Sequence, residues 1–410
     1  MRRQPAIAFI LVTVLIDVMG IGLLLPVIPA LVGEFTASRD AQTYWYGALM
    51  VTFGLAQFLC SPLLGALSDR YGRRPVLLAS ITGLGTMFFL SAIVTSLPAL
   101  LATRVLGGAL AANFSVANAY VADISTPEQR ARGFGRIGAA FGIGFIVGPA
   151  IGGTLGSIDI RLPFYAAAAL SLVNAVYGLF VLPESLPRER RKAIEWRKAN
   201  PFSSLAGLAR LKSVGALVVV IGLVTLAQFI LHGTWVLYTG FRFGWGPQEN
   251  GLSLFVVGLA SAVMQGLLLG WLLKLIGERR VVIAGMVSGL FAYTFYGLAT
   301  HGWMMYAIIA SNLLAFAVAP SLNAIVSKAA DPRQQGLAMG SLSSLASLMA
   351  VIAPLLGAPL LAEVSHLPAG DWRIGAPFFL SAALQAAALV LAVLHFRRHR
   401  PVPHVAIDAP

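Results

Sequence analysis

The sequence predicts an all-α integral membrane protein of about twelve transmembrane helices, arranged as two pseudo-symmetric bundles of six. Of its 410 residues, 58% are hydrophobic and only 11% are charged, whereas an ordinary soluble domain has roughly 25% charged residues. Apolar stretches of about twenty residues, long enough to cross a ~30 Å hydrocarbon core, recur along the whole chain. Several landmarks also return at one constant interval, which indicates that the second half repeats the first.

Each expected span is an apolar stretch between short charged or turn-forming segments. The first follows Arg2 and Arg3, but it is too long for a secretory signal, has no small-residue cleavage pattern and contains Asp17. The twelve expected spans cover 6–32, 44–67, 75–94, 98–121, 134–157, 162–182, 214–240, 249–273, 281–300, 302–326, 336–362 and 375–396.

The longest polar stretch divides the chain into two halves. We expect an N-terminal six-helix bundle over 1–182, a cytoplasmic linker over 183–213, a C-terminal six-helix bundle over 214–396 and a cytoplasmic tail over 397–410. The landmarks that recur 205 residues later are Gly65 and Gly270, Gly72 and Gly277, Arg74 and Arg279, Pro127 and Pro332, Gln129 and Gln334, and Pro149 and Pro354. Such a repeat predicts two bundles that rock about a central site, although a duplicated channel or membrane enzyme would share it.

The net charge of +13 reports membrane orientation and not a nucleic-acid partner. If both termini lie on one side, the other side has only Arg39, Arg161, Arg242 and Arg373, and Arg104 falls inside a span. The remaining 24 of the 29 basic residues lie on the side of the termini. This asymmetry follows the positive-inside rule, so we expect both termini to be cytoplasmic.

The sequence offers no feature of an enzyme, a metal site or a cofactor site. Cys60 is the single cysteine, and the six histidines show no metal-ligand spacing. No Gly-Lys pair occurs, so the phosphate-binding loop of an ATP-driven pump is absent and the energy must come from a gradient. No paired carboxylates or nucleophile–base arrangement are visible, which makes a membrane enzyme or receptor the least favoured class.

Two ionisable residues inside spans are candidates for proton coupling, Asp17 and Arg104. A charge at the bilayer centre is costly, so such residues are functional candidates by default. Asp17 would take up a proton when desolvated and release it when it faces water or a cation, and Arg104 would bias that equilibrium. The alternative is a structural role, with the two residues paired or bound to backbone opened near Pro26.

Further span residues are candidates for packing or for substrate binding. Gly144, Gly148 and Gly152 lie four residues apart and predict a smooth face for a neighbouring helix, and Pro149 removes a backbone donor. Polar and aromatic groups could form a mostly apolar pocket for an amphipathic organic molecule, although each polar group could instead bond between helices. These residues are Gln57, Asn113, Phe114, Asn118, Gln228, Trp235, Tyr238, Gln265 and Asn323.

Three motifs give the chain a resemblance to the major facilitator superfamily. GALSDRYGRRPVLL (65–78) resembles its loop signature between the second and third spans, LLATRVLGGALAA its fourth-span motif, and GIGFIVGPAIGG the fifth-span motif of its antiporters. The resemblance implies proton coupling through Arg104. It also implies a cytoplasmic gate containing Gly65, Asp69, Arg70, Gly72, Arg73, Arg74 and Asp123, and close packing at Gly144, Gly148, Pro149, Gly152 and Gly153.

Longer segments are similar to the tetracycline–proton antiporter branch, among them LIDVMGIGLLLPVIPAL, AYVADISTPEQRARGFG and TWVLYTGFRFGW. The resemblance implies a monomer in the bacterial inner membrane that exports tetracycline or a similar amphipathic drug in exchange for protons. One departure is that the acidic residues of the third and ninth spans are replaced by Met87 and Gly289. The usual charge arrangement for a metal–tetracycline chelate therefore does not transfer, and proton-coupled uptake of a small metabolite is the alternative.

Overall fold

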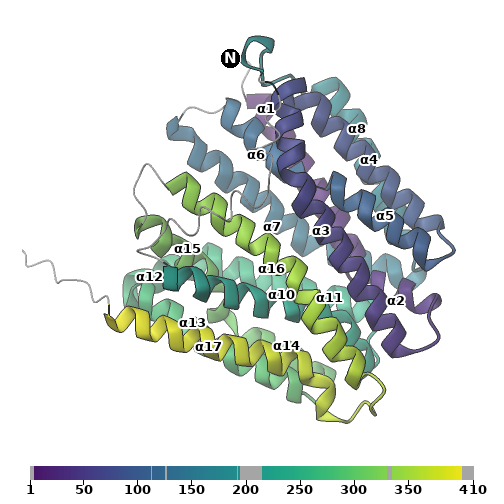
Figure 1. The fold of residues 1–410 in the computed structure, drawn as a ribbon, viewed down its shortest axis with the longest axis vertical. Helices are drawn as coiled ribbons and strands as arrows, with labels where there is room; N and C mark the ends of the chain where they lie inside the picture. The colour runs from purple at the N-terminus through teal and green to yellow at the C-terminus, as the bar shows by residue number, and fades with distance from the viewer. Residues whose placement is uncertain are drawn as a thin grey trace, which may run out of the picture.

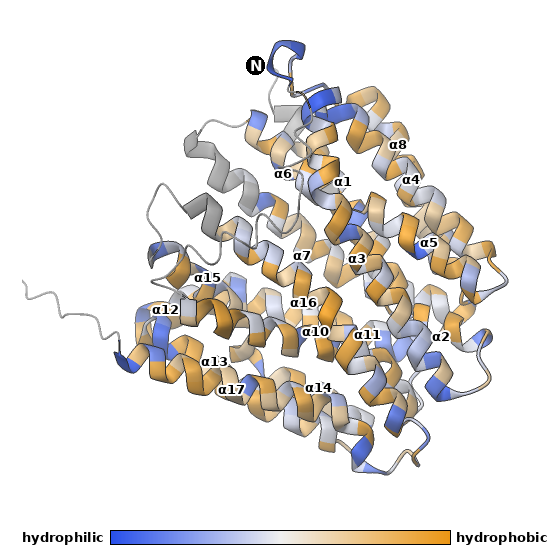
Figure 2. Cartoon of the chain, in the orientation of Figure 1, coloured by the Kyte–Doolittle hydropathy of each residue, from blue (hydrophilic) through white to orange (hydrophobic). Residues whose placement is uncertain are grey.

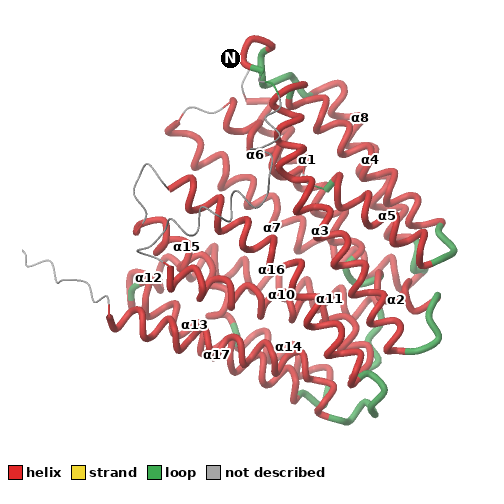
Figure 3. The backbone as a smooth tube through the Cα atoms, viewed as in Figure 1, coloured by secondary structure: helices red, strands yellow, loops and turns green. Residues whose placement is uncertain are grey.

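The computed structural model describes residues 4–111, 113–124, 127–191, 193, 215–329 and 335–398. Within these ranges the chain is helical, without strands (Figure 3). In the described part of the chain, ten helices are long and apolar enough to cross a bilayer, and the total is twelve if each of two bent helix pairs forms one span, in agreement with the expected number. Hydrophobic residues cover most of the helices, and hydrophilic residues gather at helix ends and in loops (Figure 2).

The first half forms one bundle, drawn purple to blue in Figure 1. Its first span is bent by 41° at the turn around Pro26, where the ring removes a backbone donor. The fourth span is interrupted after Leu110. The helices are α1 (Gln4–Leu24), α2 (Ile28–Glu34), α3 (Arg39–Tyr71), α4 (Arg73–Ile93), α5 (Leu97–Leu110), α6 (Asn113–Ile124), α7 (Pro127–Ile158) and α8 (Leu162–Val181), followed by the short η1 (Arg188–Arg190).

The second half forms the other bundle, drawn teal to yellow (Figure 1). One span contains a π-helical segment between α11 and α12, and another is bent by 52° after Ser311. The elements are α10 (Gly215–Phe243), α11 (Pro247–Val263), η4 (Met264–Leu268), α12 (Leu269–Ile276), α13 (Glu278–Leu298), α14 (Gly302–Ser311), η5 (Leu313–Ala317), α15 (Val318–Ala329), α16 (Gln335–Val364), η6 (Trp372–Gly375) and α17 (Ala376–Arg398).

Parts of several expected features lie outside the described residues. These parts are residues 192 and 194–214 of the linker, residues 399–410 of the tail, and the recurring Pro332 and Gln334. The domain boundaries that fall there stay predictions.

The constant interval of 205 residues extends to backbone geometry. Gly72 and Gly277 each join two helices with a positive φ, +106° and +78°, which glycine adopts without the Cβ penalty of other residues. The break after α5 at Ala111 likewise corresponds to Phe316 within the 3₁₀ segment η5. The repeat is therefore a structural duplication of the two halves.

The two halves pack against each other toward one end of the molecule. We call the end that carries Gly72 and Gly277 the basic end and the other the far end. The halves meet where α7 packs on α11 and α3 packs on α16. A Cβ built on Gly47 would lie 2.5 Å from that of Ala358, and the Arg39 guanidinium lies 5.3 Å from the centroid of the Phe241 ring. These contacts all lie toward the far end.

The hydrophobic cores follow the same division. One large cluster joins residues of both halves, such as Leu49 and Leu254. Toward the basic end, each half has a cluster of its own, around Tyr120 in the first half and around Phe396 in the second. The halves therefore share a core near the far end and pack separately near the basic end.

Candidate functional site

The residues of the loop motif after α3 form a compact ionic cluster at the basic end. Arg73 is buried, with 8% of its surface exposed. Its Nη2 lies 2.6 Å from Asp69 Oδ1 and its Nε lies 3.0 Å from Asp123 Oδ2, while Nη1 donates to Ser68 Oγ at 2.5 Å. Because a buried charge needs compensating partners, two carboxylates and a hydroxyl around one guanidinium tie α3, α4 and α6 together.

The segment that follows α8 docks onto this cluster. The backbone N–H of Arg73 donates to Glu184 Oε1 at 2.9 Å, and Ser185 Oγ donates to Asp123 at 3.2 Å. Arg191 lies 3.8 Å from the other Glu184 oxygen, and a side chain on Gly72 would collide with Glu184. Glu184 was not among the site residues predicted from the sequence, although it is an acid directly after the last span of the bundle.

The other residues of the motif lie at the edge of the cluster. Arg74 donates to the Leu179 carbonyl at 2.5 Å. Arg70 is exposed and its guanidinium lies 5.3 Å from the centroid of the Tyr71 ring. Gly65 has open space on its side-chain face, so the geometry offers no packing reason for glycine there.

The two expected proton-coupling residues are both buried, Asp17 at 9% and Arg104 at 5% exposure. Asp17 lies in α1 between Leu15 and Val18, which face α7. Arg104 in α5 donates from Nη2 to Ser91 Oγ of α4 at 3.2 Å. Its guanidinium also lies 5.8 Å from the centroid of the Phe53 ring. Whether either residue exchanges protons stays a prediction.

The glycines of the fifth-span motif bring α7 against two different neighbours. Gly144, Gly148 and Gly152 face α1, and a Cβ on Gly148 would come within 2.9 Å of the Gly22 Cα. Gly153 faces the other half instead, where a Cβ would lie 2.5 Å from the Pro247 carbonyl oxygen. Small residues allow helices to approach this closely in lipid. The motif therefore connects the α1–α7 contact to the contact between the halves.

Three of the cavities among the described helices share polar lining residues or a wall. The central cavity, of about 330 Å³, lies within the second half, and the inter-half cavity, of about 240 Å³, is lined from both halves. His232 and Leu254 line both of them. A third cavity, of about 260 Å³, shares Gln228 and Asn323 with the central one. The shared walls make the three cavities neighbours, and their lining is suited to an organic molecule.

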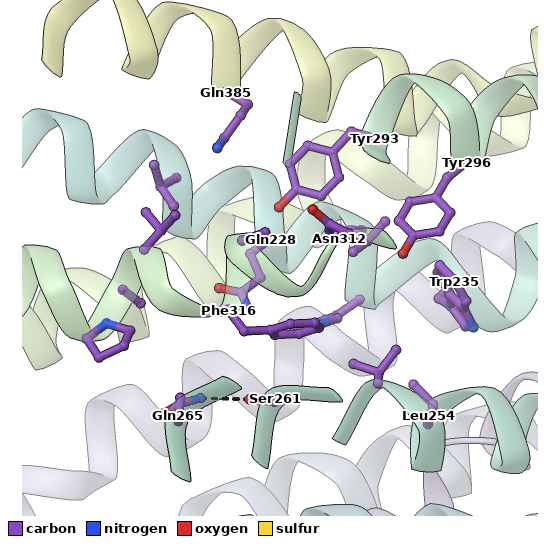
Figure 4. A pocket seen from close by; sticks show the side chains of 18 of the residues that line it. Gln228, Trp235, Leu254, Ser261, Gln265, Tyr293, Tyr296, Asn312, Phe316 and Gln385 are labelled. Carbon is purple, nitrogen blue, oxygen red and sulfur yellow. Dashed lines mark hydrogen bonds between the residues drawn. The ribbon is translucent and has the colours of Figure 1, made fainter. Parts of the chain in front are cut away.

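Amide, phenol and aromatic groups surround the central cavity. Figure 4 shows Gln228, Tyr293 and Asn312 gathered around the same space, with Phe316 on the facing side. Gln265 donates to Ser261 Oγ at 2.7 Å at the edge of this wall (Figure 4). Such a wall combines ring faces for stacking with hydrogen-bonding groups for orientation.

Five of the residues that the sequence selected for substrate binding line the cavities. Gln228, Trp235, Gln265 and Asn323 line the central cavity, and Gln57 lines the inter-half cavity. Tyr238 is fully buried in the shared core, where its hydroxyl donates to the Tyr296 carbonyl at 2.6 Å, and Asn118 is part of α6. The side chains of Asn113 and Phe114 lie outside the described part.

Several cavity residues were missed by the sequence analysis. They are His232, Tyr293, Tyr296, Asn312, Phe316 and Gln385. His232, Asn312 and Gln385 could have been selected from the sequence, because each is a polar residue inside an apolar span. The tyrosines and Phe316 carried no signal, because aromatic residues in spans also face lipid or the core.

Comparison with known proteins places the chain in a family. The family model described as Major Facilitator Superfamily matches residues 10–264 and 217–410. The chain is 39% identical over 381 residues to the tetracycline resistance protein, class C, of Escherichia coli, covering 93% of this chain and 96% of that protein. It is 34% identical to the class D protein of Salmonella ordonez, covering 92% and 95%.

Solved structures agree with this fold. The structure of the human organic anion transporter TETRAN is similar with a TM-score of 0.69 and 27% identity, covering 96% of this chain and 100% of that one. A bacterial homologue of the human lysosomal transporter Spinster, in an inward-facing and unoccupied conformation, gives a TM-score of 0.74 at 16% identity, covering 96% and 97%.

Proposed function

The chain belongs to the Major Facilitator Superfamily, and we propose that it exports tetracycline or a similar amphipathic drug in exchange for protons by alternating access. The observation that carries the proposal is the identity of 39% to a tetracycline resistance protein over nearly the whole chain. The neighbouring cavities between and within two related halves support it, because a rocking pair of bundles exposes such a site to each side in turn.

We infer that the basic end faces the cytoplasm of a bacterial cell and that both termini lie there. The asymmetry of the basic residues supports this orientation. The contacts between the halves then lie on the outer side of the membrane, and the separate cores lie on the cytoplasmic side. The three cavities lie in one chain, which supports function as a monomer.

The buried charged residues would have different roles in such an exchanger. Arg73, Asp69 and Asp123 hold the cytoplasmic ends of α3, α4 and α6 in one arrangement. Asp17 lies on α1, which packs against the glycines of α7, and α7 in turn contacts the other half. A change in the protonation of Asp17 therefore acts close to the contact between α1 and α7. Arg104 supplies a buried positive charge beside Ser91 and Phe53.

Uptake of tetracycline by energised everted membrane vesicles tests the proposal. Asp17→Asn keeps the size of the side chain and removes its titration, so we expect pH-driven uptake to fall to the background level. Glu363→Gln is the matched control, because this exposed acid lies near the far end of α16. Full proton-driven uptake by Asp17→Asn would remove Asp17 from the mechanism, and absence of energised uptake by the unaltered protein would contradict drug export.

A further inference from the structure

The walls of the three cavities contain many polar groups but no residue with a full formal charge. No Asp, Glu, Lys or Arg is among the described residues that line them. The polar side chains are amides, hydroxyls, one indole and one imidazole. They include Gln57, Gln228, His232, Tyr293, Asn312 and Gln385.

A fixed positive charge lies directly behind one of these walls. Phe53 lines the inter-half cavity, and the Arg104 guanidinium lies 5.8 Å from the centroid of its ring. In a low-dielectric interior, a charge at this range raises the energy of a cation in the cavity. The Arg104 charge therefore disfavours positively charged cargo beside Phe53.

Gly289 leaves a position at the central cavity without a side chain. A Cβ there would lie 3.1 Å from Gln385 Nε2 and 3.7 Å from the Ala315 Cβ, and both of these residues line the cavity. A carboxylate at this position would reach the cavity wall and balance a cation. The glycine supplies no such charge.

We propose that this protein transports its drug as the metal-free species that carries no net positive charge. The proposal rests on the proposed function and names the form of the substrate. Tetracyclines have neighbouring keto and enol oxygens that chelate divalent cations, and the chelate is positively charged. A buried cation without a counter-charge is costly, whereas amides and aromatic rings bind an uncharged polycyclic molecule by hydrogen bonds and stacking.

The charge of the substrate decides whether the exchange moves charge across the membrane. A singly charged chelate exchanged for one proton moves no net charge. A neutral drug exchanged for one proton moves one positive charge per cycle. Transport of the metal-free drug should therefore respond to the membrane potential even without a pH gradient.

The first experiment measures uptake of radiolabelled tetracycline by everted vesicles that contain the unaltered protein, with a fixed pH gradient. In excess EDTA we expect the initial rate to be at least as high as in magnesium. We expect about a twofold fall when magnesium chelates half of the drug, because the free drug is depleted. Loss of uptake in EDTA that magnesium restores would overturn the inference while leaving drug export in place. Absence of energised uptake in both conditions would overturn the proposed function, and this inference with it.

The second experiment imposes a potassium diffusion potential, positive inside the vesicle, at equal pH and in EDTA. A potential of ~100 mV is sufficient to support about a 50-fold accumulation if one charge moves per drug. We expect uptake that disappears when the potential is collapsed. Uptake that is driven by a pH gradient but indifferent to the potential would contradict the proposal.

A variant with an added charge tests the role of the cavity wall. Gln228→Glu keeps the shape of a residue that lines two cavities and adds a carboxylate. We expect its ratio of uptake in magnesium to uptake in EDTA to rise several-fold above that of the unaltered protein. Gln228→Met, which also lacks the amide, should leave the ratio unchanged. An equal ratio in all three proteins would contradict selection by the charge of the cavity, with equal melting temperatures confirming that the variants are folded.

Discussion

Glu278 and Lys328 form an ion pair at the basic end of the second half, at the positions that correspond to Arg73 and Asp123 of the first. Each residue follows its counterpart by 205 positions. The two bundles therefore have an ion pair at equivalent positions, but the acidic and basic residues are interchanged. The two pairs differ in exposure. The side chain of Arg73 is 10% exposed, whereas that of Lys328 is 68% exposed.

The difference in burial predicts a difference in stability between the two pairs. Arg73→Ala leaves two carboxylates without their shared cation, and we expect a loss of about 3 kcal/mol in the free energy of unfolding. Lys328→Ala removes an exposed partner, so we expect a loss below about 1 kcal/mol. Unfolding of both purified variants in the same detergent measures the difference. Equal losses would show that the buried cluster is no stronger than its exposed counterpart.

Alanine at the two loop glycines separates backbone strain from side-chain collision. Both Gly72→Ala and Gly277→Ala place a side chain at positive φ, which costs about 1–3 kcal/mol. In Gly72→Ala the new methyl also collides with Glu184, while the site at Gly277 is open. We therefore expect both melting temperatures to fall, that of Gly72→Ala further than that of Gly277→Ala, and faster proteolysis after residue 183 in Gly72→Ala alone. Identical behaviour of the two variants would indicate that the docking of Glu184 contributes nothing.

A disulfide across the halves should stop alternation. A Cβ on Gly54 would lie 3.6 Å from Cγ2 of Val351 in the other half, so cysteines at these two neighbouring positions can be tested for a disulfide across the halves. Gly54→Cys with Val351→Cys, in a Cys60→Ser background, should form it on oxidation. We expect oxidation to abolish tetracycline uptake and a reductant to restore it. The single-cysteine variants should keep their uptake, and a cross-linked protein with full uptake would contradict rocking of the halves.

The contact between α1 and α7 should depend on the absence of a side chain at Gly148. Gly148→Ala would place a methyl 2.9 Å from both the Gly22 Cα and the Met19 carbonyl oxygen, so α1 must move. We expect a loss of about 1–3 kcal/mol, typical of overpacking, together with reduced uptake. Gly138→Ala is the control on the same helix, because its side chain would meet open space. Normal uptake and stability in Gly148→Ala would show that the close contact is dispensable.

The sequence predicted the helices well because their signals are local. The length of each apolar stretch and the polar stretch in the middle are properties of neighbouring residues, and the recurring glycines are visible in the sequence itself. The bends near Pro26 and after Ser311 did not alter the number of spans. The cluster around Arg73 also followed from a local motif, although its third partner, Asp123, lies on another helix.

The sequence by itself determined the class of the protein, the duplication of its halves and the side on which its basic residues gather. Only the tertiary structure decided which polar and aromatic residues line the cavities, placing His232 and Asn312 there and Tyr238 in the core. It also decided the docking of Glu184 and the exchanged ion pair. The physical reason is that lipid and the interior of a bundle are both apolar, so hydrophobicity does not reveal which face of a membrane helix points inward.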